Sequence, residues 1–326
     1  MLEILSYSFV QRALVAAVLS GALCPAVGSY IVQRRLSLLG DGLGHIAVAG
    51  VGLALLTNTA PLPVAILVCV AGAVLIELLR SSGRASADVG LAILFYGGLA
   101  GGVMLAGLAG RGTSALSSYL FGSLTTVSAS DLYLIGGLAT VVVALSLLLE
   151  PQLFAVCADE EYARTQGLPV KALNMLIVVM AALTVSLSLR TVGVLLVSAL
   201  MVIPVAAASN IATGFKASMV LSVAFGIAVS FGGTVASVAF NTPSGATIVL
   251  LAIAFFLISA LFTLRKRRII TDAPVESEHH RATDAVVPPE TIETTEEPTA
   301  ILHGDHVDYV HHGHRHAPHG DHYDEH

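Results

Sequence analysis

The sequence predicts an all-α, polytopic membrane protein with about eight or nine transmembrane helices, followed by a disordered C-terminal tail. Hydrophobic residues make up 55% of the 326 residues and charged residues only 12%, whereas about a quarter of a soluble domain is charged. Charge is also divided unevenly. Residues 1–268 hold 14 Lys and Arg against 9 Asp and Glu, and the remainder holds 2 against 13. These observations indicate a transmembrane domain over residues 1–268 joined to an acidic tail.

Apolar stretches of a length suited to a bilayer recur along the first 268 residues. A spanning helix needs about 20 apolar residues and must pair its own backbone groups, so each stretch is expected to be a helix. The pair Arg190-Thr191 barely allows a hairpin between full helices, so one neighbour is expected to be a broken or half helix near the outer surface. The stretches are Ala13–Val32, Leu36–Leu56, Leu62–Leu79, Val89–Ala109, Leu132–Leu149, Ala172–Leu189, Val192–Ala212, Ala217–Phe240 and Gly245–Leu264.

The basic residues predict the orientation of these helices. With the N-terminus outside and nine crossings, eleven basic residues face the cytoplasm and three face outside, in agreement with the positive-inside rule. The cluster Arg265–Arg268 then ends the last helix, and the tail lies in the cytoplasm. The three outer residues are Arg12, Arg111 and Arg190.

Two ionisable residues stand out at membrane depth. Asp41 and His45 are four residues apart on the second predicted helix, so they share one face. A carboxylate and an imidazole can hold a divalent cation together, and flanking glycines admit another helix or a second copy. The alternative is a histidine held by a hydrogen bond to Asp41 for packing alone. Glu77 lies one turn from Arg80, which predicts a structural ion pair.

Five segments, in order along the chain, resemble the motifs of zinc- and manganese-type permease subunits of ATP-binding-cassette metal importers. The first segment, Arg34–His45, contains the Asp/His pair, and the resemblance covers about Leu14–Phe262. It implies the permease architecture of cobalamin and iron-chelate importers, and metal contact by Asp41 and His45 of two copies across a two-fold axis. The other segments are Tyr119–Leu124, Asp159–Pro169, Thr191–Pro204 and Asn241–Thr247.

The same resemblance implies the partners and the location. We expect a homodimer in the bacterial plasma (inner) membrane, served by a cytoplasmic ATPase dimer and by an extracytoplasmic metal-binding lipoprotein or periplasmic protein. The chain has no G-x-x-x-x-G-K-[ST] phosphate loop, so it is not expected to be an enzyme. Two loops are candidates for ATPase docking, and the second is favoured because it matches the coupling helix of related permeases. The candidate residues are Glu160 and Gly167 in the first loop, and Ala206, Asn210, Gly214 and Lys216 in the second.

The tail divides into two parts. Residues 269–302 are rich in Pro, Thr, Ala and Glu and predict a disordered acidic linker. Residues 303–326 hold nine histidines interleaved with five carboxylates, a composition typical of a borderline-metal ligand such as one for zinc. This segment is expected to buffer or sense incoming metal, or to chelate it without effect on transport. The histidines are His303, His306, His311, His312, His314, His316, His319, His322 and His326.

Together these features predict the permease of an importer that carries zinc by alternating access, with zinc as both transported ion and tail ligand. Imidazole favours zinc, and manganese or ferrous iron is the alternative cargo. An ion-coupled metal carrier or exporter without an ATPase is the alternative mechanism, although it needs a complete metal site in one chain. An intramembrane metalloprotease lacks its H-E-x-x-H motif here. We expect neither an intrinsic cofactor nor a nucleic-acid partner.

Overall fold

The computed structural model describes residues 7–82, 87–110, 114–122, 128–189 and 191–271, together with short segments of the tail at 286–287, 299–303, 306–311, 314–319 and 322–325. The chain separates into two units, Met1–Thr263 and Leu264–His326. The first unit therefore ends at Thr263 rather than at the predicted residue 268, inside the last long helix.

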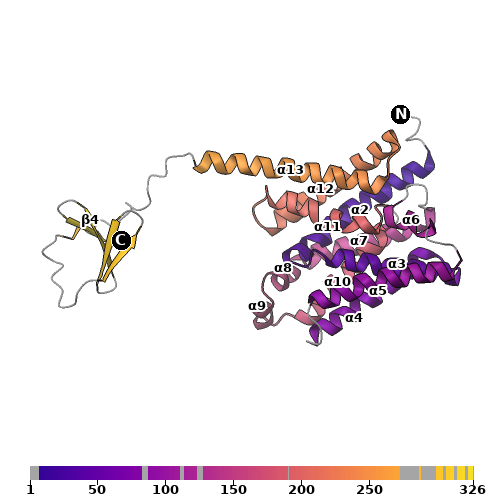
Figure 1. Ribbon diagram of the computed structural model, residues 1–326, viewed down its shortest axis with the longest axis horizontal. Helices are drawn as coiled ribbons and strands as arrows, with labels where there is room; N and C mark the ends of the chain where they lie inside the picture. Colours follow the sequence, from indigo (N-terminus) through magenta and orange to yellow (C-terminus); the bar gives the residue numbers. More distant parts are fainter. Residues whose placement is uncertain are drawn as a thin grey trace. The chain divides into compact units, whose positions relative to one another are not determined.

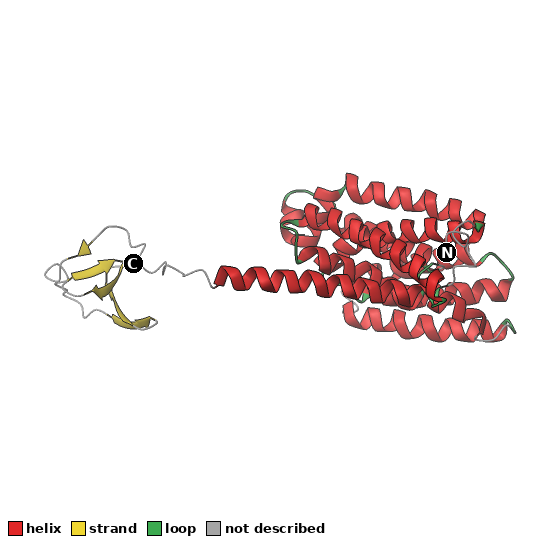
Figure 2. Ribbon diagram, turned by 90° about the horizontal axis from the view of Figure 1, so that it is seen from above, coloured by secondary structure: helices red, strands yellow, loops and turns green. Residues whose placement is uncertain are grey.

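The first unit is a bundle of long helices that lie side by side (Figures 1 and 2). Among the described residues, eight helices are long and apolar enough to cross a membrane, which confirms the predicted all-α membrane architecture. The helices are α2 (Ser8–Gln33), α3 (Leu39–Thr57), α4 (Pro61–Ser81), α5 (Ala87–Leu108), α6 (Ser114–Phe121), α7 (Ala129–Leu148), α8 (Glu150–Ala158), α9 (Glu160–Thr165), α10 (Val170–Ser188), α11 (Val194–Ser209), α12 (Phe215–Phe240) and α13 (Ser244–Thr271).

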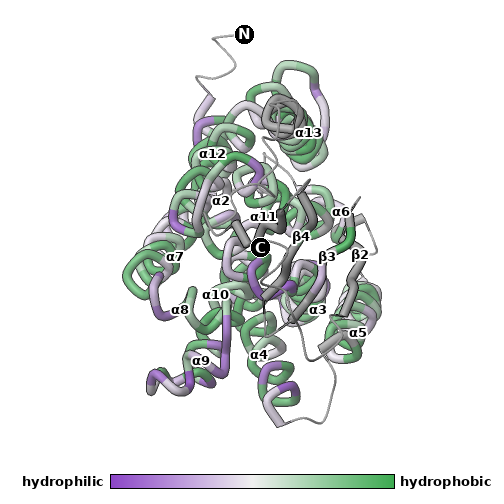
Figure 3. The backbone as a smooth tube through the Cα atoms, turned by 90° about the vertical axis from the view of Figure 1, so that its left-hand side faces the viewer, coloured by the Kyte–Doolittle hydropathy of each residue, from purple (hydrophilic) through white to green (hydrophobic). Residues whose placement is uncertain are grey.

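Helices α2, α3 and α10 form the centre of the bundle. About 70% of α2 and of each of its two neighbours is buried, against 22–39% for α4, α5, α7, α12 and α13. The outer helices remain apolar on their exposed faces, as the tube coloured by hydropathy shows (Figure 3). An apolar exterior of this kind is expected of a chain whose solvent is lipid.

Helix α11 lies in the seventh predicted apolar stretch, Val192–Ala212, and at 16 residues it is too short to cross a bilayer alone. The prediction of a short helix beside Arg190-Thr191 is confirmed, but its location near the outer surface is not. Thr191 is buried, and its hydroxyl lies 3.0 Å from that of Ser20, in the middle of α2. The junction between α10 and α11 is therefore irregular backbone inside the bundle, which lipid-exposed chain does not allow.

The junction is covered by two close backbone contacts. Gly122, with φ +75°, approaches the carbonyl oxygen of Thr191, to which an added Cβ would lie 2.7 Å. On the other side, the Ser244 hydroxyl at the start of α13 donates to the same oxygen at 3.3 Å. These contacts replace part of the hydrogen bonding that an uninterrupted helix would supply.

Two charged features of the helices have a structural explanation. Arg80 donates to both oxygens of Glu77, at 2.7 and 2.9 Å, which confirms the structural pair at the end of α4. Asp131 belongs to a capping box with Ser128 at the start of α7. Both groups are thus explained by helix structure, which leaves Asp41 and His45 as the ionisable pair without such a role.

The described segments of the tail form an antiparallel five-stranded sheet in the order β1-β5-β4-β3-β2. Its strands are β1 (Val286–Val287), β2 (Thr299–His303), β3 (His306–His311), β4 (His314–His319) and β5 (His322–Glu325). Of the expected disordered linker over 269–302, α13 takes the residues to Thr271, and β1 and the start of β2 lie in the same range, whereas residues 272–285 and 288–298 lie outside the described residues. Strands β1 and β2 contain β-branched residues, which favour strands. These few residues have little effect on the average composition of the range 269–302.

Candidate metal site

Asp41 and His45 lie at the start of α3, one turn apart, as the sequence predicts. Asp41 belongs to the first turn, where the helix dipole favours a carboxylate. Asp41 is half-buried, whereas His45 is only 5% exposed. The pair therefore spans the border between the interior of the bundle and an opening beside α3.

The glycines that flank the pair bring two helices against α3. A Cβ added to Gly40 would lie 3.2 Å from the Ser198 side chain of α11, and one added to Gly44 would lie 2.8 Å from Val194. On the other side, a Cβ added to Gly98 of α5 would lie 2.6 Å from the backbone of His45. The expected close approach of another helix is thus made by α5 and α11 of the same chain.

Asp41 is held by a serine that the sequence did not single out. The Ser198 hydroxyl on α11 donates to Oδ1 of Asp41 at 2.5 Å. A hydrogen bond to a carboxylate is stronger than one between neutral groups and fixes the side-chain rotamer. The hydrogen bond leaves Oδ2 available to a cation, so Ser198 orients the carboxylate without using both of its oxygens.

His45 is enclosed by aromatic and backbone groups. Its ring meets that of Phe95 edge-on, with 4.1 Å between ring centroids. Within the described part of the chain, its buried Nδ1 has no hydrogen-bond partner. The packing alternative, a histidine held by Asp41, is not what this geometry shows, because the hydrogen bond of Asp41 goes to Ser198.

A pocket of about 330 Å³ opens beside the pair, between α3 and α5. Its wall includes Asp41, Gly42, Phe95 and Tyr96. Tyr96 is 70% exposed, and the neighbouring Ile93 is also exposed. The carboxylate thus faces a space that one copy of the chain leaves open on the α5 side.

One chain does not complete a metal site around this pair. Among the residues whose side chains are described, no group of three or more His, Cys, Asp and Glu gathers in one place. Transition-metal sites commonly use three or four protein ligands. Asp41 and His45 can therefore supply half of a site, and the remainder must come from water or from another chain.

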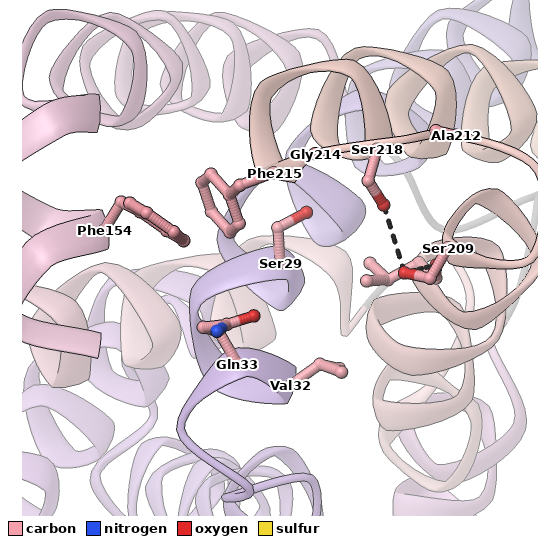
Figure 4. Close-up of a pocket in the computed structure, with 10 residues that line it drawn as sticks. Ser29, Val32, Gln33, Phe154, Ser209, Ala212, Gly214, Phe215 and Ser218 are labelled. Atoms are coloured by element: carbon pink, nitrogen blue, oxygen red, sulfur yellow. Dashed lines mark hydrogen bonds between the residues drawn. The ribbon is translucent and has the colours of Figure 1, made fainter. Parts of the chain in front are cut away.

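The two loops proposed for ATPase docking meet at one end of the bundle. A second pocket, of about 300 Å³, lies between them and takes Phe154 from α8 and the segment Ser209–Ser218 from the α11–α12 turn (Figure 4). The rings of Phe154 and Phe215 are stacked at a tilt, 4.6 Å apart. The structure therefore brings the two alternative loops into one surface.

The six docking candidates divide by exposure. Lys216, Gly214 and Gly167 are exposed, and Ala206 is half-buried in α11. Asn210 is tied to α13, because its Nδ2 donates to the Ser259 hydroxyl at 3.0 Å and its carbonyl oxygen accepts from Thr263. The exposed members can contact a partner, whereas Asn210 joins this surface to the bundle.

Glu160, the remaining candidate, is part of a buried polar junction. Arg34, whose side chain is 6% exposed, donates to Oε1 of Glu160 at 2.5 Å, and Asn174 donates to the same oxygen at 3.0 Å. The junction joins α9 to α10 and to the residue that follows α2. Nearby, burial raises the pKa of the Cys157 thiol to about 12, against a smaller opposing effect of Arg34.

The structure gives the tail histidines backbone positions in the strands. His303, His306, His311, His314, His316, His319 and His322 lie in β2 to β5. His312 and His326 fall outside the described residues.

Comparison with known proteins relates the helical bundle to a family of transport proteins. The profile of the family described as the ABC 3 transport family matches residues 6–263. The manganese transport system membrane protein MntC of Halalkalibacterium halodurans is 31% identical over 80% of this chain and 89% of its own. The chelated iron transport system membrane protein YfeD of Yersinia pestis is 30% identical over 80% and 87%.

A solved structure agrees with these sequence matches. PsaBC from Streptococcus pneumoniae, determined in complex with a Fab, has a TM-score of 0.71 and 30% identity, over 78% of this chain and 91% of the matched chain. The family match ends near Thr263, where the first structural unit ends. It thus concerns the helical bundle and does not include the histidine-rich tail.

Proposed function

Because the chain belongs to the ABC 3 transport family, we propose that it is the membrane permease subunit of an ATP-driven importer that carries a divalent metal, with zinc as the favoured cargo. The observation that supports this best is the Asp41/His45 pair, which borders a pocket at the α3–α5 face and is oriented by α11. Glu77 and Asp131 have structural partners at their helix ends. Asp41 and His45 are therefore the candidate point of metal contact.

The incomplete ligand set supports a homodimer. One chain supplies the Asp41 carboxylate on a pocket that opens toward the exposed side of α5, and the buried His45 imidazole one turn further along α3. A two-fold axis at this face would bring two such pairs together and give a cation four protein ligands. The exposed Tyr96 and Ile93 then become buried at the interface, which would remove an apolar surface from lipid without loss of hydrogen bonds.

The cargo is argued from ligand chemistry. Imidazole ligands suit zinc, and histidines occur both at the bundle site and throughout the tail. Manganese and iron form the second candidate because two relatives are named for manganese and chelated iron transport. A carboxylate in the site is compatible with these harder cations as well, so competition between metals decides the matter.

The power source is proposed to be a separate ATPase dimer that docks where α8, α9 and the α11–α12 turn meet. This surface contains the exposed Lys216 in the α11–α12 turn and the pocket that Phe154 and Phe215 line. Because both predicted loops contribute to it, a choice between them is not needed. An extracytoplasmic metal-binding protein is expected to deliver the cation at the opposite end.

The orientation proposed for the chain places the docking surface and the tail in the cytoplasm and the N-terminus outside. Helix α11 starts beside the middle of α2 and ends beside Ser259 and Thr263 of α13. The short α11 thus returns the chain to the side from which α10 started. This return preserves the alternation of sides that the basic residues require, although α11 does not span the bilayer.

Uptake into vesicles tests the proposal. The chain, reconstituted with its ATPase and supplied with ATP, should accumulate radioactive zinc, and unlabelled zinc should compete better than manganese. Asp41→Asn and His45→Gln should each abolish uptake, while Asp131→Asn, a matched change at a helix cap, should leave it intact. Protease protection and gel filtration should confirm that each variant inserts and folds.

Three results would contradict parts of the proposal. Normal uptake by both pathway variants would exclude the metal contact. Uptake that needs no ATP and no ATPase would favour the ion-coupled carrier instead, and better competition by manganese would replace zinc as the cargo.

A further inference from the structure

The histidine-rich segment is an eight-residue repeat. Residues 303–310, 311–318 and 319–326 each begin with the pattern H-x-x-H-x-[D/H], which reads HGDHVD, HHGHRH and HGDHYD in turn. An irregular chelating tail has no need of such a period. A constant spacing of histidines instead indicates that each repeat occupies the same position in a regular backbone structure.

The strand register shows what that position is. In each repeat the first histidine ends one strand and the second begins the next. The two are cross-strand partners in all three hairpins: His303 with His306, His311 with His314, and His319 with His322. The register therefore sets two histidines opposite one another at the end of each of these three strand pairs, which we call the three hairpins. Residues directly opposite one another in an antiparallel pair have Cβ atoms about 5 Å apart.

The third residue of each pattern lies on the same face as its pair. Residues two apart along a strand share a face, so Asp308 accompanies His306 in β3 and Asp324 accompanies His322 in β5. In the middle repeat, His316 accompanies His314 in β4. Each hairpin thus gathers three potential ligands on one face, two histidines and an aspartate in the outer repeats and three histidines in the middle one.

We propose that the tail carries three separate divalent-cation sites, one at each hairpin, formed by His303, His306 and Asp308, by His311, His314 and His316, and by His319, His322 and Asp324. Three ligands of this kind with an open fourth position for water suit zinc. The all-histidine middle site should discriminate most strongly against manganese, because imidazole is the softer ligand. This inference rests on the metal-binding role proposed for the tail and specifies its arrangement.

The sheet also sets the sites relative to one another. The two outer sites lie on the same face and at the same end, and the β3–β4 register, continued from Tyr309 and His316, sets His306 opposite His319. The middle site lies at the other end and on the other face. His303, His306, His319 and His322 therefore form a row across four adjacent strands. Four strands span about 14 Å, more than twice the reach of an imidazole, so a single cation cannot bind all four histidines. Three equivalents of metal are therefore expected rather than one.

The test is a zinc titration of the purified full-length chain in detergent, competed with a chromophoric chelator to count bound equivalents. Deletion of residues 272–326 should remove three equivalents. His306→Asn, His314→Asn and His322→Asn should each remove one. The matched controls His312→Asn and His326→Asn, which change histidines outside the three ligand positions, should remove none.

A composition-preserving variant separates the arrangement from simple histidine content. The exchange Val307→Asp with Asp308→Val moves the aspartate of the first site to the opposite face, and should weaken one equivalent at least tenfold. If every histidine variant, controls included, lowers binding equally, or if this exchange has no effect, the three-site arrangement is wrong. If the deletion removes no zinc, the metal-binding role of the tail itself fails, and the uptake test of Asp41 and His45 is unaffected by either result.

Discussion

Replacement of Ser198 by alanine tests whether the carboxylate of Asp41 is positioned by α11. The change removes the hydroxyl that donates to Asp41 Oδ1 at 2.5 Å and keeps the Cβ that packs against Gly40. A hydrogen bond to a charged group contributes about 1.5–3 kcal/mol. Loss of a group that orients a metal ligand typically weakens metal binding about 10–100-fold. We therefore expect Ser198→Ala to raise the KM for metal uptake by at least tenfold.

The measurement is the concentration dependence of zinc uptake in vesicles that contain the permease and its ATPase. The matched control is Ser186→Ala, a buried serine of α10 whose hydroxyl donates to the carbonyl oxygen of Ala182 rather than to the site. A purely structural role would lower the amount of folded protein and leave KM unchanged. An unaltered KM in Ser198→Ala, with Asp41→Asn inactive, would refute the positioning role.

Three further predictions concern packing, coupling and thiol chemistry. Gly98→Ala should reduce uptake severely because its Cβ would lie 2.6 Å from the backbone of His45, whereas Gly137→Ala in α7, where nothing lies within 4 Å of the added Cβ, should not; uptake and insertion of both variants check this. Glu160→Gln should lower the free energy of unfolding in detergent by about 2 kcal/mol. This value lies between those for buried and exposed ion pairs, because Arg34 is buried and Glu160 is 39% exposed. The variant should also transport less metal per ATP hydrolysed, and an unchanged ratio would exclude a role in coupling. Because burial raises the pKa of Cys157 to about 12, maleimide should label it slowly at pH 8 in the folded protein and rapidly after denaturation, as mass spectrometry of the labelled peptide can show.

Sequence reasoning predicts those residues of the candidate site that are chemically unusual in a membrane and misses those that are not. Asp41 and His45 stand out because ionisable groups are costly in lipid. Ser198 does not, since serine is common in apolar helices and lies 157 residues from its partner. Likewise Arg34 was counted for orientation, although its partner Glu160 is 126 residues away. Contacts over such separations depend on how the helices pack, which periodicity alone does not determine.

The fold was predictable to the extent that hydrophobic length is informative. The eight long helices follow directly from apolar stretches near 20 residues. The position of the apolar stretch after Arg190 could not be predicted in this way, because it depends on tertiary contacts of Thr191 with Ser20 and Ser244. In the tail, the average composition does not reveal short runs such as Thr299–His303, which forms a strand.

Helix α11 is the element through which the metal site and the docking surface are physically joined. Ser198 near its start orients Asp41, and Asn210 just past its end is bonded to α13. Twelve residues of helix separate them, about 18 Å, and the interior Pro204 removes one hydrogen bond from that stretch. The N-terminal end of α11 packs against the backbone of Gly122. This end of the helix is therefore fixed inside the bundle. Helix α11 thus links Ser198, the hydrogen-bond donor to Asp41, with Asn210 at the end of the bundle where docking is proposed.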